Sequence, residues 1–249
     1  MTTAKSSTAS NVLDILLLFD HSTTELSAEE ISALIDTTRS TTYRYLRTLL
    51  DKGFLEKTPG GKYCLGPYFV RLGRVANRKT DIGRIALPVM EHIVEETKET
   101  VLLTRRSGRY SVCIERVEGS HAVRISFEKG HIQPLHAGAS SKILLAYAGD
   151  EARDDYFSQP LEGFTAHTIT DPVYLEKQLD EIRRQGYCVS HGEVDEDAVA
   201  VSVPIFDAQG RLIAALSLAG PAFRMHAAVI QSHLEALRTG VKDIEAQLP

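Results

Sequence analysis

Two amphipathic helices followed directly by a β-hairpin are the sequence feature that most constrains this chain. The first helix begins at Ser27, where Ser27-Ala28-Glu29-Glu30 forms a capping box. The second helix spans residues 39–52, and its buried side is expected to hold Thr42, Tyr45, Leu46 and Leu49. Two short alternating strands around a Pro59-Gly60-Gly61 turn follow at once. With an apolar helix over residues 11–20 in front, this order predicts a winged helix-turn-helix.

The opposite side of the second helix carries short hydroxyls and then two arginines one turn apart, Arg44 and Arg47. Such a face suits a helix in the major groove, because hydroxyl and N–H groups meet phosphates and arginines reach guanine edges or phosphates. An isolated helix with an ordinary solvated face would look similar. The hairpin beside it, with Lys57 and Lys62 flanking its tip, favours DNA binding.

Charge is divided unevenly along the chain. The net charge is −5, but residues 1–80 hold 11 Lys/Arg against 8 Asp/Glu, a balance of +3. Residues 81–249 hold 17 against 25, a balance of −8. A basic head on an acidic body fits a DNA-binding head whose body stays off the phosphates.

Cysteines and apolar runs indicate a reducing, non-membrane setting. Cys64, Cys113 and Cys188 are far apart, so we expect reduced thiols, with no disulfide and no zinc site. The apolar run 12–19 is too short to span a bilayer and follows small polar residues rather than a basic leader. We therefore expect a cytoplasmic protein.

The second half of the chain has a mixed α/β pattern. Strands are expected at 101–104, 111–117, 122–127, 187–190, 199–206 and 212–218. Helices are expected at 82–97, from 140 or 141 to 148, from Pro172 to 185, and at 225–246. An antiparallel sheet flanked by helices is a common architecture of small-ligand sensors. The expected organisation is a disordered tail (1–9), a DNA-binding domain (10–66), a linker helix (67–80) and a sensor domain (81–249).

A loop of small residues opens the helix near Ser140. Free N–H groups at a helix N-terminus, with the positive end of the helix dipole behind them, attract anions. The N–H groups of Ala139 and Ser140, with a serine hydroxyl, are therefore expected to hold a carboxylate. Leu135, Ile125 and Phe127 are expected as apolar lining because they lie near this loop in the sequence.

Over nearly its whole length the chain resembles the IclR-type transcription regulators. The similar segments are NVLDILLLF, LSAEEISALIDTTRSTTYRYLRTLLDKGFLE, YCLG, GHIQPLHAGASSK at 130–142, residues 184–207 and ALSLAGP at 215–221. The resemblance implies an α+β fold, in which a GAF-like domain follows the winged helix-turn-helix, and an assembly of dimers or pairs of dimers. It also implies a small carboxylate or aromatic metabolite as effector.

The resemblance assigns site residues by motif position. The DNA contacts it implies are Arg39, Ser40, Thr41, Thr42, Tyr43, Arg44 and Arg47, besides Lys57 and Lys62 of the wing. Thr42 ranks below Arg44 because the helical pattern turns it toward the core. The effector contacts it implies, in addition to Leu135, Ala139 and Ser140, are Ser190 or His191, Ala200, Ser217 and Ala219.

The chain departs from the family motifs at several positions. Asp197 stands where the family generally has glycine, and Ser141-Lys142 stands where it has Gly-Lys. Ala200 and Ala219 are apolar where some relatives have polar groups, so a drier pocket that favours an aromatic or longer acid is expected.

Enzyme motifs are missing at the spacings that catalysis needs. The segment 138–142 lacks the second glycine of a GxSxG elbow, and Ala139 stands where an SxxK pair needs serine. No phosphate-binding or dinucleotide-binding glycine motif occurs, so no catalytic residue, metal or cofactor is expected. The sequence predicts a ligand-responsive repressor of a catabolic operon that binds a double-stranded operator. A constitutive regulator without effector, or a winged-helix protein-interaction module with a sensor domain, stays open.

Overall fold

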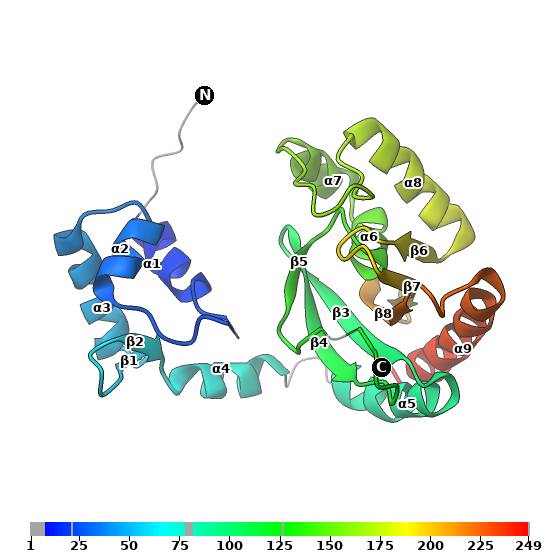
Figure 1. Ribbon diagram of the computed structural model, residues 1–249, viewed down its shortest axis with the longest axis horizontal. Coiled ribbons are helices and arrows are strands. Elements are labelled where there is room, and N and C mark those ends of the chain that lie inside the picture. Colours follow the sequence, from blue (N-terminus) through cyan, green and yellow to red (C-terminus); the bar gives the residue numbers. More distant parts are fainter. Residues whose placement is uncertain (1–7, 21, 78–81, 126, 249) are drawn as a thin grey trace. The chain divides into compact units, whose positions relative to one another are not determined.

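The computed structural model describes residues 8–20, 22–77, 82–125 and 127–248 (Figure 1). The chain divides into two compact units, Met1–Thr80 and Asp81–Pro249. Each unit has its own core and is described by itself.

Unit 1 is the winged helix-turn-helix that the sequence predicts. Its elements are α1 (Thr8–Leu17), α2 (Ala28–Leu34), α3 (Arg39–Asp51), β1 (Leu55–Lys57), β2 (Tyr63–Leu65) and α4 (Tyr68–Asn77). The capping box at Ser27 is present, with the Ser27 hydroxyl and the Glu30 carboxylate each accepting a backbone N–H. Gly66 ends the hairpin and lies so close to the Gly53 backbone that a Cβ there would clash.

The predicted tail and first helix are shifted relative to the structure. Residues 1–7 lie outside the described residues, but Thr8 and Ala9 already belong to α1, because no proline or glycine interrupts the helix there. The helix ends at Leu17, earlier than predicted. Asp20 turns the chain by accepting the N–H groups of Ser22 and Thr23 at 2.8 and 2.7 Å.

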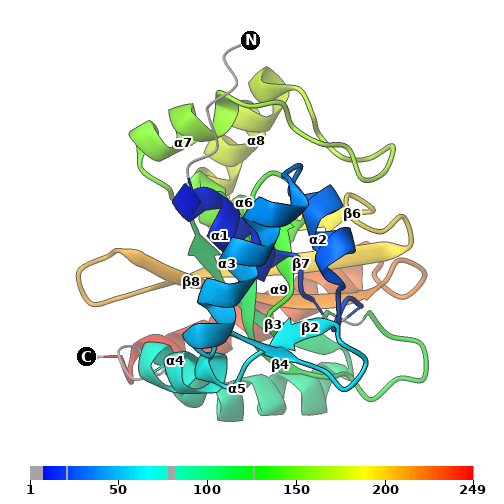
Figure 2. The same ribbon diagram turned by 90° about the vertical axis from the view of Figure 1, so that its left-hand side faces the viewer.

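Unit 2 is a six-stranded antiparallel sheet covered by helices on both faces (Figures 1 and 2). Its strands, in the spatial order β5-β4-β3-β8-β7-β6, are β3 (Thr100–Ser107), β4 (Tyr110–Val117), β5 (Ile132–Pro134), β6 (Cys188–His191), β7 (Ala198–Phe206) and β8 (Leu212–Pro221). The helices are α5 (Ile82–Thr97), α6 (Ala139–Ala146), α7 (Asp150–Phe157), α8 (Pro172–Gln185) and α9 (Ala227–Glu245).

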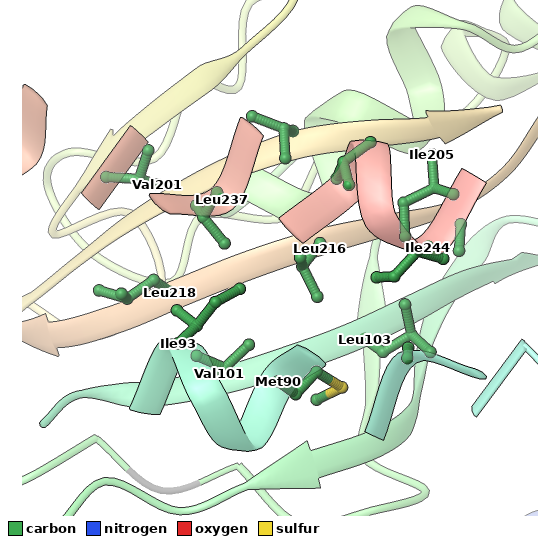
Figure 3. Close-up of a cluster of buried hydrophobic side chains, with 14 of the residues drawn as sticks. Met90, Ile93, Val101, Leu103, Val201, Ile205, Leu216, Leu218, Leu237 and Ile244 are labelled. Carbon is green, nitrogen blue, oxygen red and sulfur yellow. The ribbon is translucent and has the colours of Figure 1, made fainter. Parts of the chain in front are cut away.

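Strand alternation assigns each side chain to one face of this sheet. The odd-numbered β7 residues Val201 and Ile205 pack with Leu216 of β8 against α5 and α9, forming the main core (Figure 3). The even-numbered residues, such as Ala200 and Ser202, face α6 instead. On that second face a smaller core joins α6 to α8.

The sequence predictions for unit 2 need three corrections. Residues 122–125 and 127 form no strand, although Val123, Ile125 and Phe127 alternate as strand residues do. One edge strand is β5, which pairs with β4 at residues where the sequence predicts no strand. Helix α7 was also not predicted. The cap of α8 is as expected, with Asp171 accepting two N–H groups ahead of Pro172.

Candidate DNA-binding surface and ligand cavity

Helix α3 exposes the side chains that the sequence proposes as DNA contacts. Ser40, Tyr43, Arg44 and Arg47 are exposed and Thr41 is partly exposed. Arg39 is also exposed and lies 3.9 Å from Glu29. The Arg44 guanidinium stands 5.7 Å from the Tyr45 ring, while Arg47 contacts no acceptor in the described part of the chain. The face thus presents guanidinium and hydroxyl donors together.

Thr42 does not belong to this face. Its side chain has no exposed surface, and its hydroxyl donates to the Thr38 carbonyl at 3.1 Å. The proposed DNA contact through this side chain is therefore wrong, because the helical period turns it into the core.

The wing hairpin exposes two lysines and is held in place by backbone hydrogen bonds. Lys57 pairs with Tyr63 across the hairpin, and its ammonium lies 5.5 Å from the Tyr63 ring. Lys62 is exposed next to the turn, which Thr58 closes with backbone bonds to Gly61 and Lys62. Leu26 adds two further backbone bonds to Tyr63 at 3.0 and 2.7 Å, so the hairpin is tied to the helices.

In unit 2 a cavity lies on the α6 side of the sheet. One end is walled by apolar or weakly polar side chains, namely Leu102, Cys113, Ile125, Phe127, Ala200 and Ala219. The polar residues of the wall come from the strands, the β4–β5 loop, the start of α6 and the β6–β7 turn: Thr104, Ser111, His131, Gln133, Ser140, Ser190, Glu193, Asp195 and Ser217. A ligand with a polar head and an apolar body fits this division.

The start of α6 supplies unused donors to the polar part. Gly138 precedes the helix with a φ of 83°, a conformation that favours glycine. No protein group within the described chain accepts the N–H of Ala139 or Ser140. These two N–H groups stand at the positive end of the helix dipole. They can bind an oxyanion without breaking any existing bond.

The serine hydroxyls in the cavity wall differ in the hydrogen bonds that they can still form with a ligand. Ser217 donates to Ser202 at 3.0 Å, and Ser202 donates to the Leu216 carbonyl, so the Ser217 oxygen keeps only acceptor capacity. Ser190 is buried at the cavity, and no hydrogen bond of its hydroxyl is found in the described chain. Ser190 can therefore donate to a ligand while Ser217 accepts from one.

A buried ion pair holds the β6–β7 turn against α6. The Lys142 ammonium is fully buried, pairs with the Glu193 carboxylate and also donates to Gln178 at 3.0 Å. The second Glu193 oxygen accepts the Gly138 N–H at 3.1 Å. Thr168 donates to the Glu193 carbonyl at 2.6 Å, which ties a further loop to the turn. Glu193 therefore fixes the polar end of the cavity.

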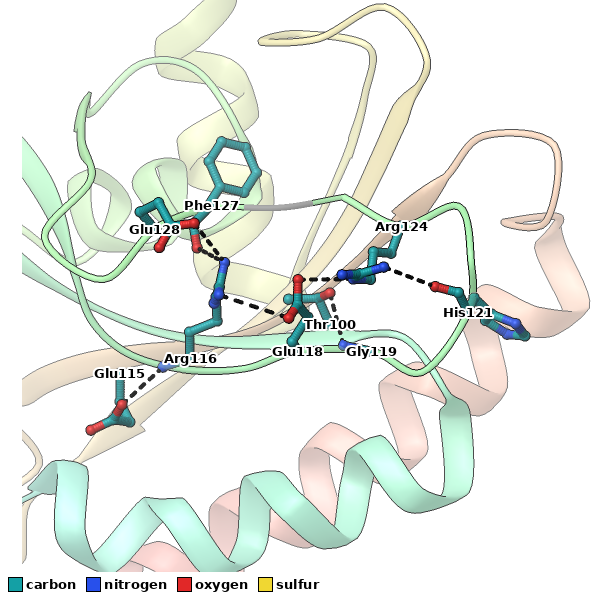
Figure 4. Close-up of polar contacts among 9 residues, drawn as sticks. All are labelled: Thr100, Glu115, Arg116, Glu118, Gly119, His121, Arg124, Phe127 and Glu128. Carbon is teal, nitrogen blue, oxygen red and sulfur yellow. Dashed lines mark hydrogen bonds and ion pairs between the residues drawn. The ribbon is translucent and has the colours of Figure 1, made fainter. Parts of the chain in front are cut away.

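The loop between β4 and β5 adds Ile125 and Phe127 to the apolar end of the cavity and is held by the polar contacts drawn in Figure 4. Arg116 of β4 donates to the Phe127 carbonyl at 3.1 Å and pairs with Glu128 at 3.3 Å. Arg124 pairs with Glu118 at 2.8 Å near the start of the loop. These bonds hold Ile125 and Phe127 over the cavity although the segment is not a strand.

His136 anchors the segment in front of α6 and does not line the cavity. Its Nε2 lies 2.7 Å from the Glu162 carbonyl and its Nδ1 lies 2.8 Å from the Tyr156 hydroxyl. Nε2 must donate to the carbonyl, so Nδ1 accepts from Tyr156, whose oxygen accepts the His136 N–H at 3.1 Å. All ring donors and acceptors are used, and the side chain serves structure.

The buried thiols are protonated near neutral pH. Burial raises the pKa of Cys113 to about 11 and that of Cys188 to about 12. All three cysteines are free. Cys113 therefore acts in the cavity wall as a small apolar group.

Two proposed effector contacts lie outside the cavity, whereas six line it. The six are Ala139, Ser140, Ser190, Ala200, Ser217 and Ala219. Leu135 is buried in the core between α6 and α8, and His191 is exposed because it follows Ser190 in a strand and points to the opposite face. The ion pair Lys142–Glu193 was not foreseen. A lysine inside the apolar run of α6 was the available signal for a buried partner.

Comparisons with known proteins give the same assignment over both units. The model of the IclR helix-turn-helix domain matches residues 8–59, and that of the bacterial transcriptional regulator IclR C-terminal domain matches residues 75–246. The HTH-type transcriptional regulator KipR of Bacillus subtilis (strain 168) is 31% identical, over 98% of this chain and 96% of KipR. The HTH-type transcriptional repressor AllR of Salmonella typhimurium (strain LT2) is 30% identical, over 94% of this chain and 87% of AllR.

Solved structures agree with these relatives. One is a crystal structure described as that of an IclR transcriptional regulator from Silicibacter sp. TM1040. It matches with a TM-score of 0.88 and 27% identity, and 98% of each chain is covered. Another is an IclR homologue from Microbacterium hydrocarbonoxydans complexed with 4-hydroxybenzoate, with a TM-score of 0.80, 30% identity, and 97% of this chain and 99% of that chain covered. The chain therefore belongs to the IclR family of bacterial transcriptional regulators, which bind DNA and are not enzymes.

Proposed function

We propose that this regulator represses a catabolic operon and that a small carboxylate in the cavity changes its affinity for operator DNA. Binding to the double-stranded operator uses the exposed face of α3 and the wing lysines. The exposed donors of Arg44 and Arg47 support this role, and the similarity to a named repressor supports the sign of regulation.

The observation that carries the effector assignment is the pair of unused N–H groups at Ala139 and Ser140. They face a cavity with a free Ser190 hydroxyl and an apolar far end. A carboxylate at α6 with an apolar or aromatic body on Phe127 and Ala200 satisfies both parts. The ligand of the Microbacterium homologue, 4-hydroxybenzoate, has this chemistry.

Apolar side chains on two helices support a homodimer or a dimer of dimers. Leu13 and Leu17, one turn apart on α1, are 60% and 72% exposed. Val70 and Val75 of α4 are also exposed. Burying such patches against a second copy removes apolar surface from water. A dimer would place two heads on half-sites about one helical turn or a multiple apart, and the ligand would act by changing that spacing.

A thermal-shift screen of small aliphatic and aromatic carboxylates, including 4-hydroxybenzoate, tests the effector assignment. A ligand at about a hundred times its Kd adds roughly 2.7 kcal/mol to the stability of the protein. Ser190→Ala is expected to reduce the shift, whereas Ser107→Ala, exposed at the β3–β4 turn, serves as the matched control.

Two outcomes would contradict parts of the proposal. No shift with any carboxylate would favour a constitutive regulator without effector. Failure of the protein to bind any duplex from a random-sequence pool would favour a winged-helix module that binds protein.

A further inference from the structure

A second pocket lies in unit 2 at the other end of α6, beside the β7–β8 hairpin. Three of the ten residues that line it are arginines, Arg105, Arg106 and Arg211, and none of the ten is Asp or Glu. The body of the chain as a whole is acidic, with 17 Lys/Arg against 25 Asp/Glu over residues 81–249. A local concentration of guanidinium groups in an acidic domain attracts anions to this position.

Two of these guanidinium groups have donors to spare. Arg105, on β3, is partly buried and has neither a hydrogen-bond acceptor nor a carboxylate partner in the described chain. Arg106 uses Nε to bind the Gly108 carbonyl at 3.2 Å, and no partner is found there for its terminal amino groups. A partly buried guanidinium without acceptors is costly, so an acceptor supplied from outside stabilises it.

Neighbouring acceptors are already occupied. Asp207 binds Arg211 at 2.7 Å and accepts two backbone N–H groups, and these bonds lower its pKa. Glu245 accepts the Phe206 N–H at 2.7 Å. Arg183 covers two carbonyls at the C-terminal end of α6. None of these groups competes for Arg105 or Arg106.

The remaining wall of the pocket is aromatic and aliphatic. Tyr147 and Phe206 form an edge-to-face pair with ring centroids 5.2 Å apart, and Leu144, Leu212 and Ile213 lie beside them. Guanidinium groups bind carboxylate and phosphate oxygens in a planar fork. We infer that this pocket binds a second small ligand, an oxyanion (carboxylate or phosphate) carried on an apolar or aromatic body.

This pocket shares two elements with the cavity. Strand β3 gives Leu102 and Thr104 to the cavity and the next residue, Arg105, to the pocket. Helix α6 begins at the cavity with Ala139, and Tyr147, which follows its last residue, lines the pocket. A ligand held by Arg105 therefore acts on the same strand and helix that shape the effector cavity.

Titration calorimetry of the full chain with phenyl phosphate, benzoate and inorganic phosphate tests the inference. Arg105→Gln and Arg106→Gln are each expected to weaken binding of phenyl phosphate, of benzoate, or of both by about 10- to 100-fold. Arg184→Gln makes the same charge change at an exposed site on α8 and is expected to leave binding unchanged. Benzoate belongs to the carboxylates proposed for the effector cavity, so only the part of its binding that Arg105→Gln or Arg106→Gln weakens is assigned to this pocket.

The three probes also distinguish which chemical class of anion the pocket binds. Where binding depends on Arg105 or Arg106, a preference for phenyl phosphate or for benzoate identifies a phosphorylated or a carboxylated ligand, and both support the site. Inorganic phosphate binding as tightly as phenyl phosphate would overturn the role of the aromatic wall. The site itself is overturned if none of the probes binds at millimolar concentration, or if Arg105→Gln and Arg106→Gln bind as the unaltered chain does.

Discussion

Thr42 of α3 is buried, so we expect it to stabilise the fold and not to contact DNA. Its buried hydroxyl bonds the Thr38 carbonyl at the start of the helix. Thr42→Val keeps the branched shape and removes this bond, so a loss of about 1 kcal/mol in the free energy of unfolding is expected. Urea denaturation measures that loss. Duplex affinity of the folded variant should equal that of the unaltered chain, and a tenfold weaker affinity would show that Thr42 contacts DNA.

Lys142 and Glu193 form a buried ion pair at the polar end of the cavity. Lys142→Met leaves a buried carboxylate without its cation, and the expected loss in unfolding free energy is about 3–5 kcal/mol. The double variant Lys142→Met/Glu193→Leu is expected to regain part of it. Lys177→Met, on the exposed side of α8, is the control in the same denaturation series. A Lys142→Met protein as stable as the control would mean that the pair contributes nothing.

His233 makes stability depend on pH. Burial lowers its pKa, and the smaller opposing effect of Glu99 raises it. The unfolded chain therefore takes up a proton more readily than the folded one, so stability present above the unfolded pKa is lost as the pH falls below it. His233→Gln is expected to flatten the stability profile between about pH 7 and pH 5. The exposed His191→Gln is the control, because no ion pair of His191 is found in the described chain, and an equal effect of both variants would contradict the assignment.

Arg116 holds the β4–β5 loop near Phe127 and Glu128, whereas Gly130 and His131 are held by backbone bonds to Cys113 of β4. Arg116→Gln removes the bonds to the Phe127 carbonyl and to Glu128. Amide exchange at residues 127–129 is therefore expected to rise about tenfold. Hydrogen exchange read by mass spectrometry checks this, with Arg238→Gln on α9 as control. Unchanged exchange in the loop would show that its ion pairs do not hold it.

Helices could be predicted better than strands because their signals are local. The capping box at Ser27 and the Asp171-Pro172 start of α8 each mark the start of a helix with a signal that spans at most four residues. The segment 122–127 was misread because its alternation places Ile125 and Phe127 over a cavity, and alternation alone does not reveal whether a neighbouring strand exists. Strand β5 has three residues, too few for a periodic signal.

The site was predictable where one stretch of sequence builds it. Ala139 and Ser140 follow from a small-residue loop before a helix, and both line the cavity. Glu193 was missed because its partner, Lys142, lies 51 residues away in the chain. His191 and Leu135 were placed wrongly because motif position does not specify which face of a strand or loop a side chain occupies.

Taken as one chain, a DNA-binding unit precedes a unit that holds the cavity. The family assignment covers both units, and the charge division gives the smaller one the basic surface. Among the described residues no helix is long and apolar enough to cross a membrane, and no cluster of side chains fits a metal ion. The central claim is that the exposed arginines of α3 bind DNA.

The salt dependence of duplex binding tests this claim most directly. Fluorescence anisotropy would follow the full chain on a duplex selected from a random pool, with Arg44→Gln, Arg47→Gln and the control Arg184→Gln. The logarithm of the association constant is expected to fall linearly with the logarithm of the salt concentration, with a slope of about −0.9 for each phosphate contacted. Each α3 variant is expected to cost about 1–3 kcal/mol if the arginine reads a base, or to reduce the slope by about 1 if it binds phosphate. Binding that is insensitive to salt, or α3 variants that bind like the control, would contradict the account.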